Sequence, residues 1–234
     1  MTTIKTTTNQ LLTALPVKSL PGLLSKMERV ELVYDTDVYK AGAIITHVCF
    51  PESGIISLLA VVGKNSTIEV GIVGDEGMVG LPVFLGIETS LNRAVVQGAG
   101  FAMKMASNDF LSECDSSTEF QRVLRHFAYS LMTQISQSAA CNRFHPIDAR
   151  LARWLLMTRD RMRSDEFQIT QNFLSNMLGV RREAVNKAAS AFQEQELISY
   201  TRGLLNIIDG NALELIACSC YEIIAGRPAA SLIF

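Results

Sequence analysis

The sequence lacks the features of a membrane protein or a secreted protein. Among its 234 residues, no apolar run approaches the roughly 18 residues that span a bilayer. The N-terminal segment holds many threonines and a broken apolar region, which makes a poor secretory signal. The five cysteines are an odd number, and their spacing does not resemble the disulfide framework of a secreted domain. We therefore expect a cytoplasmic protein with no membrane partner.

Histidine is scarce, and this argues against a metal-dependent enzyme. A cupin-like barrel enzyme needs histidine and carboxylate ligands on its strands, and of three histidines only His47 lies in the strand region. Cys49 would share a strand face with His47, but a small buried cysteine is the simpler interpretation. Cys218 and Cys220 stand two apart in an apparent helix, so they would point away from each other. The cysteine spacing does not fit an iron–sulfur centre either, and we expect no catalytic residue, no enzyme activity and no metal site.

Charge is unevenly distributed along the chain, although the net charge is only −2. Residues 1–142 carry 10 Lys or Arg against 13 Asp or Glu, and residues 203–234 carry one against three. Residues 143–202 carry 10 against 7, a balance of +3. A basic excess confined to one segment is typical of an attached nucleic-acid-binding unit.

Short apolar runs between about residues 31 and 106 predict β-structure. Glycines recur there 9 to 12 residues apart, at Gly42, Gly54, Gly63, Gly74, Gly86 and Gly98. Regular short strands with such turn signals indicate an antiparallel barrel or sandwich. We expect hairpin turns at "PESG" and "GKNS". The predicted fold class is α+β, with an N-terminal antiparallel, jelly-roll-like β-barrel followed by helices.

A long helix is predicted from about Ser117 to Asn142. Its apolar stripe has the 4-3-4 spacing of a coiled-coil seam and comprises Phe120, Leu124, Phe127 and Leu131. We expect this stripe to form a dimer interface, because a helix of roughly 39 Å overhangs a barrel of this size. The alternative is that the stripe packs on the chain's own barrel. The helix should end near His145, because Pro146 disfavours helix at the residue before it.

Residues 169–208 have the pattern of a helix-turn-helix followed by a small hairpin. Thr170 is a good N-cap for a short helix, and Gly179 suits a left-handed residue at its end. In the next helix, predicted over residues 182–195, apolar side chains recur on one arc. The opposite, polar arc includes Arg182, Glu183, Asn186, Lys187 and Ser190. Such a helix rests on its partner and contacts base edges with its first turns, and Arg202 in the hairpin is placed to touch phosphate.

The segment "ITQNFLSNMLGVRREAVNKAASAFQEQELISYTRG" resembles the winged helix-turn-helix of the cyclic-AMP receptor/fumarate-nitrate regulator (Crp/Fnr) transcription factors. "CNRFHPIDARLARWLL" is similar to the hinge and first helix of the same domain. The barrel and long helix fit that family's effector domain and dimerisation helix. The resemblance implies four parts: a cyclic-nucleotide-binding-like effector domain (1–116), a dimerisation helix and hinge (117–145), a winged helix-turn-helix (146–214) and a C-terminal tail (215–234).

The resemblance also implies roles for individual residues. The base-reading positions of the recognition helix correspond to Arg182, Glu183 and Lys187, with Asn186 on the same arc. Thr170 and Gln171 match positions near the phosphate backbone. Arg181 stands where many members have serine, and we expect it to contact the DNA backbone.

The family's effector pocket is only partly matched. Arg93 and Ala94 match the pair that holds the cyclic phosphate, and Gly80 matches a glycine of the same cassette. Leu81 occupies the place of the glutamate that holds the ribose hydroxyl. Because a buried hydroxyl without a partner costs about 1–3 kcal/mol, we do not expect cyclic AMP as the ligand. The alternative role for Arg93 is a salt bridge within the barrel.

These observations predict a homodimeric transcription regulator that binds a near-palindromic operator in double-stranded DNA. Its effector is a small molecule that the sequence does not identify, and no cofactor is assigned. The resemblance implies RNA polymerase as a further partner. The alternative is a ligand-sensing signalling module whose helical domain binds protein rather than DNA.

Overall fold

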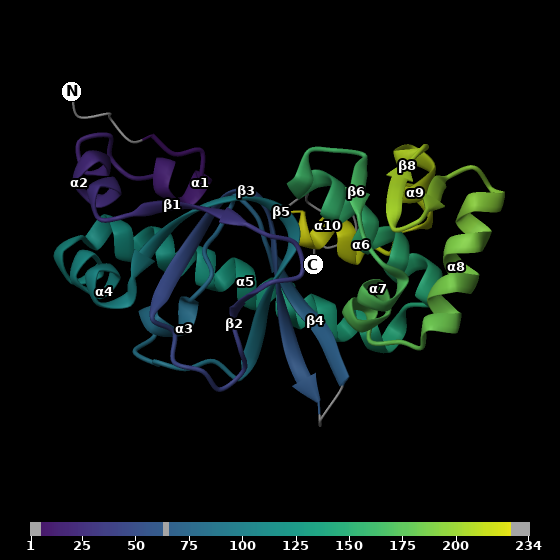
Figure 1. The fold of residues 1–234 in the computed structure, drawn as a ribbon, viewed down its shortest axis with the longest axis horizontal. Helices are drawn as coiled ribbons and strands as arrows, with labels where there is room; N and C mark the ends of the chain where they lie inside the picture. Colours follow the sequence, from purple (N-terminus) through teal and green to yellow (C-terminus); the bar gives the residue numbers. More distant parts are fainter. Residues whose placement is uncertain (1–5, 63–65, 226–234) are drawn as a thin grey trace, which may run out of the picture. The chain divides into compact units, whose positions relative to one another are not determined.

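The computed structural model describes residues 6–62 and 66–225. The chain divides into two compact units (Figure 1). The first, called the sheet unit, comprises Met1–Val61 and Ile72–Met132, and the second, called the helical unit, comprises Val62–Gly71 and Thr133–Phe234. Within the described ranges, every helix is too short or too polar to cross a membrane.

Five strands form the larger sheet, in the order β1-β5-β3-β4, with β2 also paired to β5. Their bounds are β1 Glu28–Leu32, β2 Asp37–Tyr39, β3 His47–Val62, β4 Ser66–Val73 and β5 Asn92–Ala106. The pairings of β1, β2 and β3 with β5 are antiparallel, which confirms the predicted α+β class. The strand order of the described residues does not return from β4 to β1, so the sheet is open rather than a closed barrel.

Two of the predicted turns lie inside long strands. β3 runs through Gly54 and β5 runs through Gly98, so the predicted hairpin at "PESG" is wrong. Gly54 has a φ of 80°, a left-handed conformation that suits glycine, and the β3–β5 register shifts on both sides of it. A β-bulge therefore keeps the strand continuous where the sequence suggests a break. Gly63, in the expected "GKNS" turn, lies outside the described residues.

An aromatic cluster forms part of the core of the sheet unit. The helices of this part of the chain are α1 Gln10–Thr13, α2 Leu20–Ser25, α3 Leu81–Phe84, α4 Ser107–Ser116 and the long α5 Thr118–Phe144. Phe50 from β3, Phe110 from α4 and Phe120 from α5 are all fully buried. The rings of Phe110 and Phe120 meet edge to face with centroids 5.7 Å apart, a favoured geometry for aromatic pairs. The cluster thus packs α4 and the start of α5 against β3.

The apolar stripe of α5 faces the chain's own core, and this corrects the predicted dimer seam. Phe120, Leu124 and Leu131 are each 6 % exposed or less, and the Phe127 ring fills the space beside Gly77. Phe120, Leu124 and Leu131 therefore leave little surface for a partner subunit to cover, whereas Phe127 is half-buried. The 4-3-4 spacing shows only that one face of the helix is buried, and packing within the chain is the correct interpretation for Phe120, Leu124 and Leu131.

The helical unit continues from the end of α5 at Phe144, immediately before His145 and Pro146 as predicted. Its elements are α6 Ile147–Met162, β6 Glu166–Gln168, α7 Gln171–Leu178, α8 Arg182–Glu194, β7 Ile198–Thr201, β8 Leu204–Ile207, α9 Gly210–Ile216 and α10 Cys220–Ile224. Strands β6, β8 and β7 form a small antiparallel sheet in that order. The sequence pattern predicts β7 and β8 but not β6, which has three residues and one buried side chain, Phe167. Trp154 and Leu155 of α6, together with Leu174 of α7, are fully buried in its core.

Candidate nucleic-acid interface

Local hydrogen bonds fix the turn between α7 and α8. The hydroxyl of Thr170 accepts a hydrogen bond from the Phe173 N–H at 3.1 Å, which confirms it as the N-cap of α7. Gly179 ends α7 with a φ of 62°, and its N–H donates to the Asn176 carbonyl at 3.3 Å. Arg181 then has extended backbone angles and precedes the first residue of α8. The two helices and their sharp connection therefore follow from the residue types that the sequence supplies at these positions.

α8 has one buried face and one charged, exposed face. The buried side chains are 3 % exposed or less and comprise Val185, Ala188, Ala189 and Phe192. The exposed residues at the start of the helix are Arg181, Arg182, Glu183 and Lys187. A face of this kind, at the N-terminal end of the second helix of a helix-turn-helix, is the one that enters a DNA major groove in known complexes.

Asn186 departs from the prediction that it shares the exposed arc. It is half-buried, and its Oδ1 atom is buried without a hydrogen-bond partner among the described residues. Asn186 follows the fully buried Val185 directly, which places it at the edge of the packed face of α8. Its carbonyl oxygen is therefore unavailable to a base edge in this conformation.

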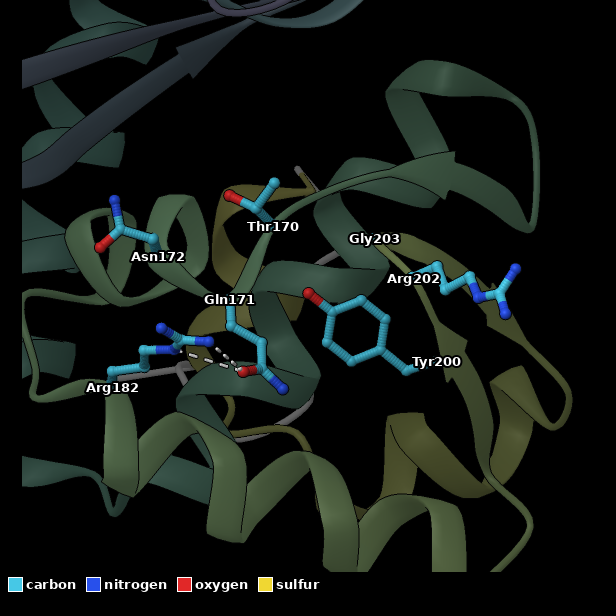
Figure 2. Close-up of a pocket in the computed structure, with 7 residues that line it drawn as sticks. All are labelled: Thr170, Gln171, Asn172, Arg182, Tyr200, Arg202 and Gly203. Carbon is cyan, nitrogen blue, oxygen red and sulfur yellow. Dashed lines mark hydrogen bonds between the residues drawn. The ribbon is translucent and has the colours of Figure 1, made fainter.

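The hairpin after α8 places an arginine at its tip. Arg202 and Gly203 have φ values of 51° and 84° between β7 and β8, and two positive φ angles are the signature of a tight type I′ hairpin turn. The Tyr200 hydroxyl donates to the Ile169 carbonyl at 2.8 Å, and the Ile169 N–H donates to the Gly203 carbonyl at 2.7 Å. These bonds connect the hairpin to the chain just before α7. Figure 2 shows the Arg202 side chain extending away from the ribbon.

A groove of about 380 Å³ joins the start of α7, the start of α8 and the hairpin (Figure 2). Its lining residues are Thr170, Gln171, Asn172, Arg182, Tyr200, Arg202 and Gly203, with two arginines and no carboxylate in this described set. Arg182 donates to the Gln171 Oε1 atom from two nitrogens, at 3.2 and 3.4 Å. The structure thus brings four predicted site residues to one groove. It adds Asn172 and Tyr200, which no sequence motif indicates. A cationic, hydrogen-bonding groove of this kind suits a phosphate group.

The residues predicted to bind an effector lie in the sheet unit. Arg93 forms an ion pair with Asp37 across paired strands, and Ala94 is fully buried. Gly80 has a φ of 106° and precedes α3, with Val48 against the position where a Cβ would lie. Leu81 is buried. The ion pair agrees with the alternative role of Arg93 as a salt-bridged residue of the sheet.

The cysteines fall into two groups. Cys49 and Cys114 are buried in the sheet unit, and burial raises the pKa of the Cys49 thiol to about 11. The other three gather in the helical unit, where Cys141, Cys218 and Cys220 lie close to His145. The prediction that Cys218 and Cys220 share one helix is wrong, because α9 ends at Ile216 and α10 begins at Cys220.

The comparisons with known proteins agree with this architecture. Residues 149–216 match the model of the Crp-like helix-turn-helix domain. Among curated protein sequences there is no match. A Crp/Fnr family transcriptional regulator from Thermus thermophilus matches with a TM-score of 0.68 and 16% identity, over 81% of this chain and 98% of that chain.

Two further solved structures have the same fold. FixK2 from Bradyrhizobium japonicum matches with a TM-score of 0.69 and 11% identity, over 82% of this chain and 98% of that one. The c-di-GMP responsive global regulator CLP from Xanthomonas campestris matches with a TM-score of 0.68 and 14% identity, over 83% and 100%. The chain therefore has the fold of the Crp/Fnr transcription regulators, with a C-terminal segment that matches the Crp-like helix-turn-helix domain.

Proposed function

We propose that this chain is a sequence-specific, DNA-binding transcription regulator of the Crp/Fnr type. The observation that carries the proposal is the groove in which Arg182, Gln171 and Arg202 meet at the exposed start of α8. Arginine donates two parallel hydrogen bonds to guanine, and glutamate accepts from the cytosine amino group. Arg182 and Glu183 would read base edges, and Lys187 would do so one turn further along α8.

The surrounding residues would hold the DNA backbone. Arg202 at the hairpin tip and Arg181 before α8 are both exposed cations, and Thr170 and Gln171 line the groove beside them. Contacts to phosphate set the register and orientation of a protein on the duplex without reading sequence. Removing a base-reading side chain should therefore change the preferred sequence, whereas removing a phosphate contact should weaken binding to all sequences alike.

The functional form would be a homodimer on a near-palindromic operator, with two recognition helices roughly 34 Å apart. The dimer contact would be formed by the exposed face of α5 instead of the predicted seam, which is buried in the core. Six of the exposed residues of α5 recur with spacing 4-3-4-3-4, namely Arg125, Tyr129, Met132, Ser136, Ala139 and Arg143. Tyr129 and Met132 are 73% and 65% exposed, and we propose that they form the apolar centre of the dimer contact.

A small molecule bound to the sheet unit would regulate DNA binding. The protein would be cytoplasmic and would also contact RNA polymerase. Arg93, Ala94 and Gly80 remain the proposed effector residues. The charge of Arg93 is offset by Asp37, so an anionic ligand would have to displace that carboxylate. Cyclic AMP is not proposed as this ligand, because Leu81 cannot accept a hydrogen bond from a ribose hydroxyl.

The test is a binding measurement on DNA selected from a random pool by the purified full-length chain. We expect a near-palindromic site to be enriched, and Arg182→Ala to weaken its binding by about 1–3 kcal/mol with relaxed preference at one base pair per half-site. Lys18→Ala is the control, because it removes one exposed cation from the sheet unit. If no sequence were enriched, the helical unit would not read DNA, and a protein-binding signalling module would be the better description.

A further inference from the structure

Four side chains with the chemistry of metal ligands meet in the helical unit, from two segments far apart in the sequence. Cys141 lies in the last turn of α5 and His145 follows the last residue of that helix. Cys220 is the first residue of α10, and Cys218 lies two residues before it. Their ligand atoms all lie within 4.8 Å of one another. The sulfurs of Cys141 and Cys218 are 3.4 Å apart, and Nδ1 of His145 is 3.4 Å from the sulfur of Cys220.

The backbone explains why Cys218 and Cys220 reach the same point. Ala217 has φ −60° and ψ 145°, an extended conformation that ends α9. Ser219 then turns back into helical angles before α10. This break removes the 200° separation that two residues two apart would have in a continuous helix, so both sulfurs can approach α5.

Buried positive charge surrounds the cluster. Arg150 and Arg153 of α6 are 7% and 5% exposed, and the charges of both act on the Cys141 thiol or its neighbour Cys218. Among the described residues neither guanidinium has a carboxylate within ion-pair distance, and the Nε atom of each has no hydrogen-bond partner. Buried charges are normally compensated. An anionic group bound at the cluster would therefore offset part of this buried positive charge.

We propose that Cys141, His145, Cys218 and Cys220 bind one Zn²⁺ ion. Three cysteines and one histidine are an established ligand set for closed, tetrahedral structural zinc sites. Zinc–sulfur bonds of about 2.3 Å in a tetrahedron place sulfurs about 3.8 Å apart, close to the 3.4 Å between the sulfurs of Cys141 and Cys218. A cluster of several irons needs its ligands further apart than a single ion does. Zn²⁺ with three thiolates and a neutral histidine has a net charge of −1, which offsets one of the two positive charges of Arg150 and Arg153.

A hydrogen bond supports one of the ligands from outside the set. Gln137, one turn before Cys141 on α5, donates from Nε2 to the sulfur of Cys220 at 3.1 Å. Such N–H donors orient a metal ligand and stabilise its thiolate. The site therefore has four ligand side chains and one supporting hydrogen bond.

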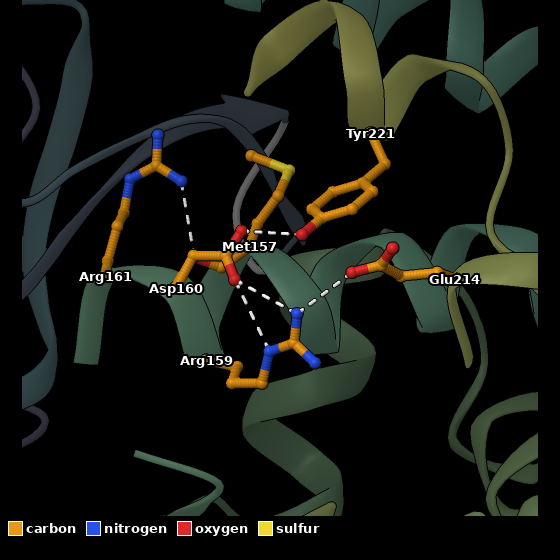
Figure 3. Close-up of polar contacts among 6 residues, drawn as sticks. All are labelled: Met157, Arg159, Asp160, Arg161, Glu214 and Tyr221. Atoms are coloured by element: carbon orange, nitrogen blue, oxygen red, sulfur yellow. Dashed lines mark hydrogen bonds and ion pairs between the residues drawn. The ribbon is translucent and has the colours of Figure 1, made fainter. Parts of the chain in front are cut away.

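The ion would connect the end of α5 to the C-terminal helices. In the sequence, the whole helix-turn-helix lies between the two pairs of ligands. The same C-terminal segment is also held to α6 by polar contacts (Figure 3). Tyr221, next to Cys220, donates to Asp160 at 2.7 Å, and Glu214 accepts from Arg159 at 3.2 Å. The zinc site would connect the same C-terminal segment to the end of α5, just before α6 begins. Its role would be to hold the DNA-binding helices in a fixed orientation at the end of α5.

The first experiment measures bound metal in the full-length chain purified under reducing conditions. We expect one zinc per chain by elemental analysis, and we expect Cys220→Ala to lose it. Cys114→Ala is the matched control, because it removes a buried cysteine from the sheet unit and should retain the zinc. Gln137→Ala should keep the ligands but weaken zinc affinity about 10–100-fold.

A second measurement keeps the proposal testable even if Cys220→Ala does not fold. Co²⁺ replacing zinc in the wild-type chain should show the visible absorption of a tetrahedral thiolate site, and a chelator should lower the melting temperature. The proposal would be overturned by reduced, folded protein that binds neither Zn²⁺ nor Co²⁺. Purification with an iron–sulfur cluster, or with a Cys141–Cys218 disulfide and no metal, would equally overturn it. None of these outcomes depends on whether the chain binds DNA.

Discussion

The two faces of α5 give a sharp prediction, because one is buried within the chain and the other is exposed. Phe120→Ala removes a ring that is 1% exposed and packs edge to face on Phe110. Truncating a buried phenylalanine costs about 3–5 kcal/mol in the free energy of unfolding. Tyr129→Glu changes a side chain that is 73% exposed, so it should alter the unfolding of the single chain by only about 0.5 kcal/mol. At a dimer seam the same change should weaken association by about 2 kcal/mol, or roughly 30-fold.

Two assays on the same proteins separate these effects. Urea denaturation at one fixed protein concentration measures stability, and sedimentation equilibrium over a range of concentrations measures dimer dissociation. Leu91→Glu is the control for Tyr129→Glu, because Leu91 is an exposed apolar residue, 89% exposed, outside α5. A monomeric Phe120→Ala with unchanged stability would refute the assignment of that face to the core. A Tyr129→Glu dimer as tight as wild type would refute the proposed seam.

Two further predictions concern the helical unit. Arg202→Ala should lower the slope of log affinity against log salt concentration by about 2 per dimer, since two phosphate contacts are lost at about 0.9 each. A salt titration on the selected operator measures this slope. A change in base preference would contradict a phosphate role for Arg202. Thr170→Ala removes the acceptor of the Phe173 N–H and should cost about 0.5–2 kcal/mol of unfolding free energy in urea denaturation. Thr170→Ser, which keeps a hydroxyl, should remain near wild type, and equal losses in both variants would show that the methyl group rather than the cap matters.

The sequence alone predicts the features that depend on local residue types. Thr170 marks the start of α7, Gly179 marks its end and Pro146 limits α5, because caps and breakers act within a few residues. The apolar period of α8 identifies its buried face before any fold is known. The match of residues 149–216 to the Crp-like helix-turn-helix domain and the shared fold agree with the family resemblance seen in the same segment.

Burial within a domain is harder to predict, because it depends on which partner covers a face. The stripe at Phe120 and Leu124 has the same spacing whether it packs on a second subunit or within the chain. Only the folded chain shows that both side chains are buried and that Phe50 of β3 and Phe110 of α4 pack on Phe120. Asn186 lies at the margin of a face, where a helical projection cannot assign burial. Gly54 is a bulge rather than a turn because β5 pairs along both sides of it.

The sequence by itself determined the start and end of α7, the end of α5 and the charged face of α8, since each is set by side chains a few residues apart. Tertiary structure decided the contacts between distant segments. Arg93 meets Asp37, 56 residues away, through strand pairing, and Cys141 meets Cys218, 77 residues away, through the break between α9 and α10. A scan for metal-ligand spacing does not find such a cluster, because its ligands become neighbours only when the chain is folded.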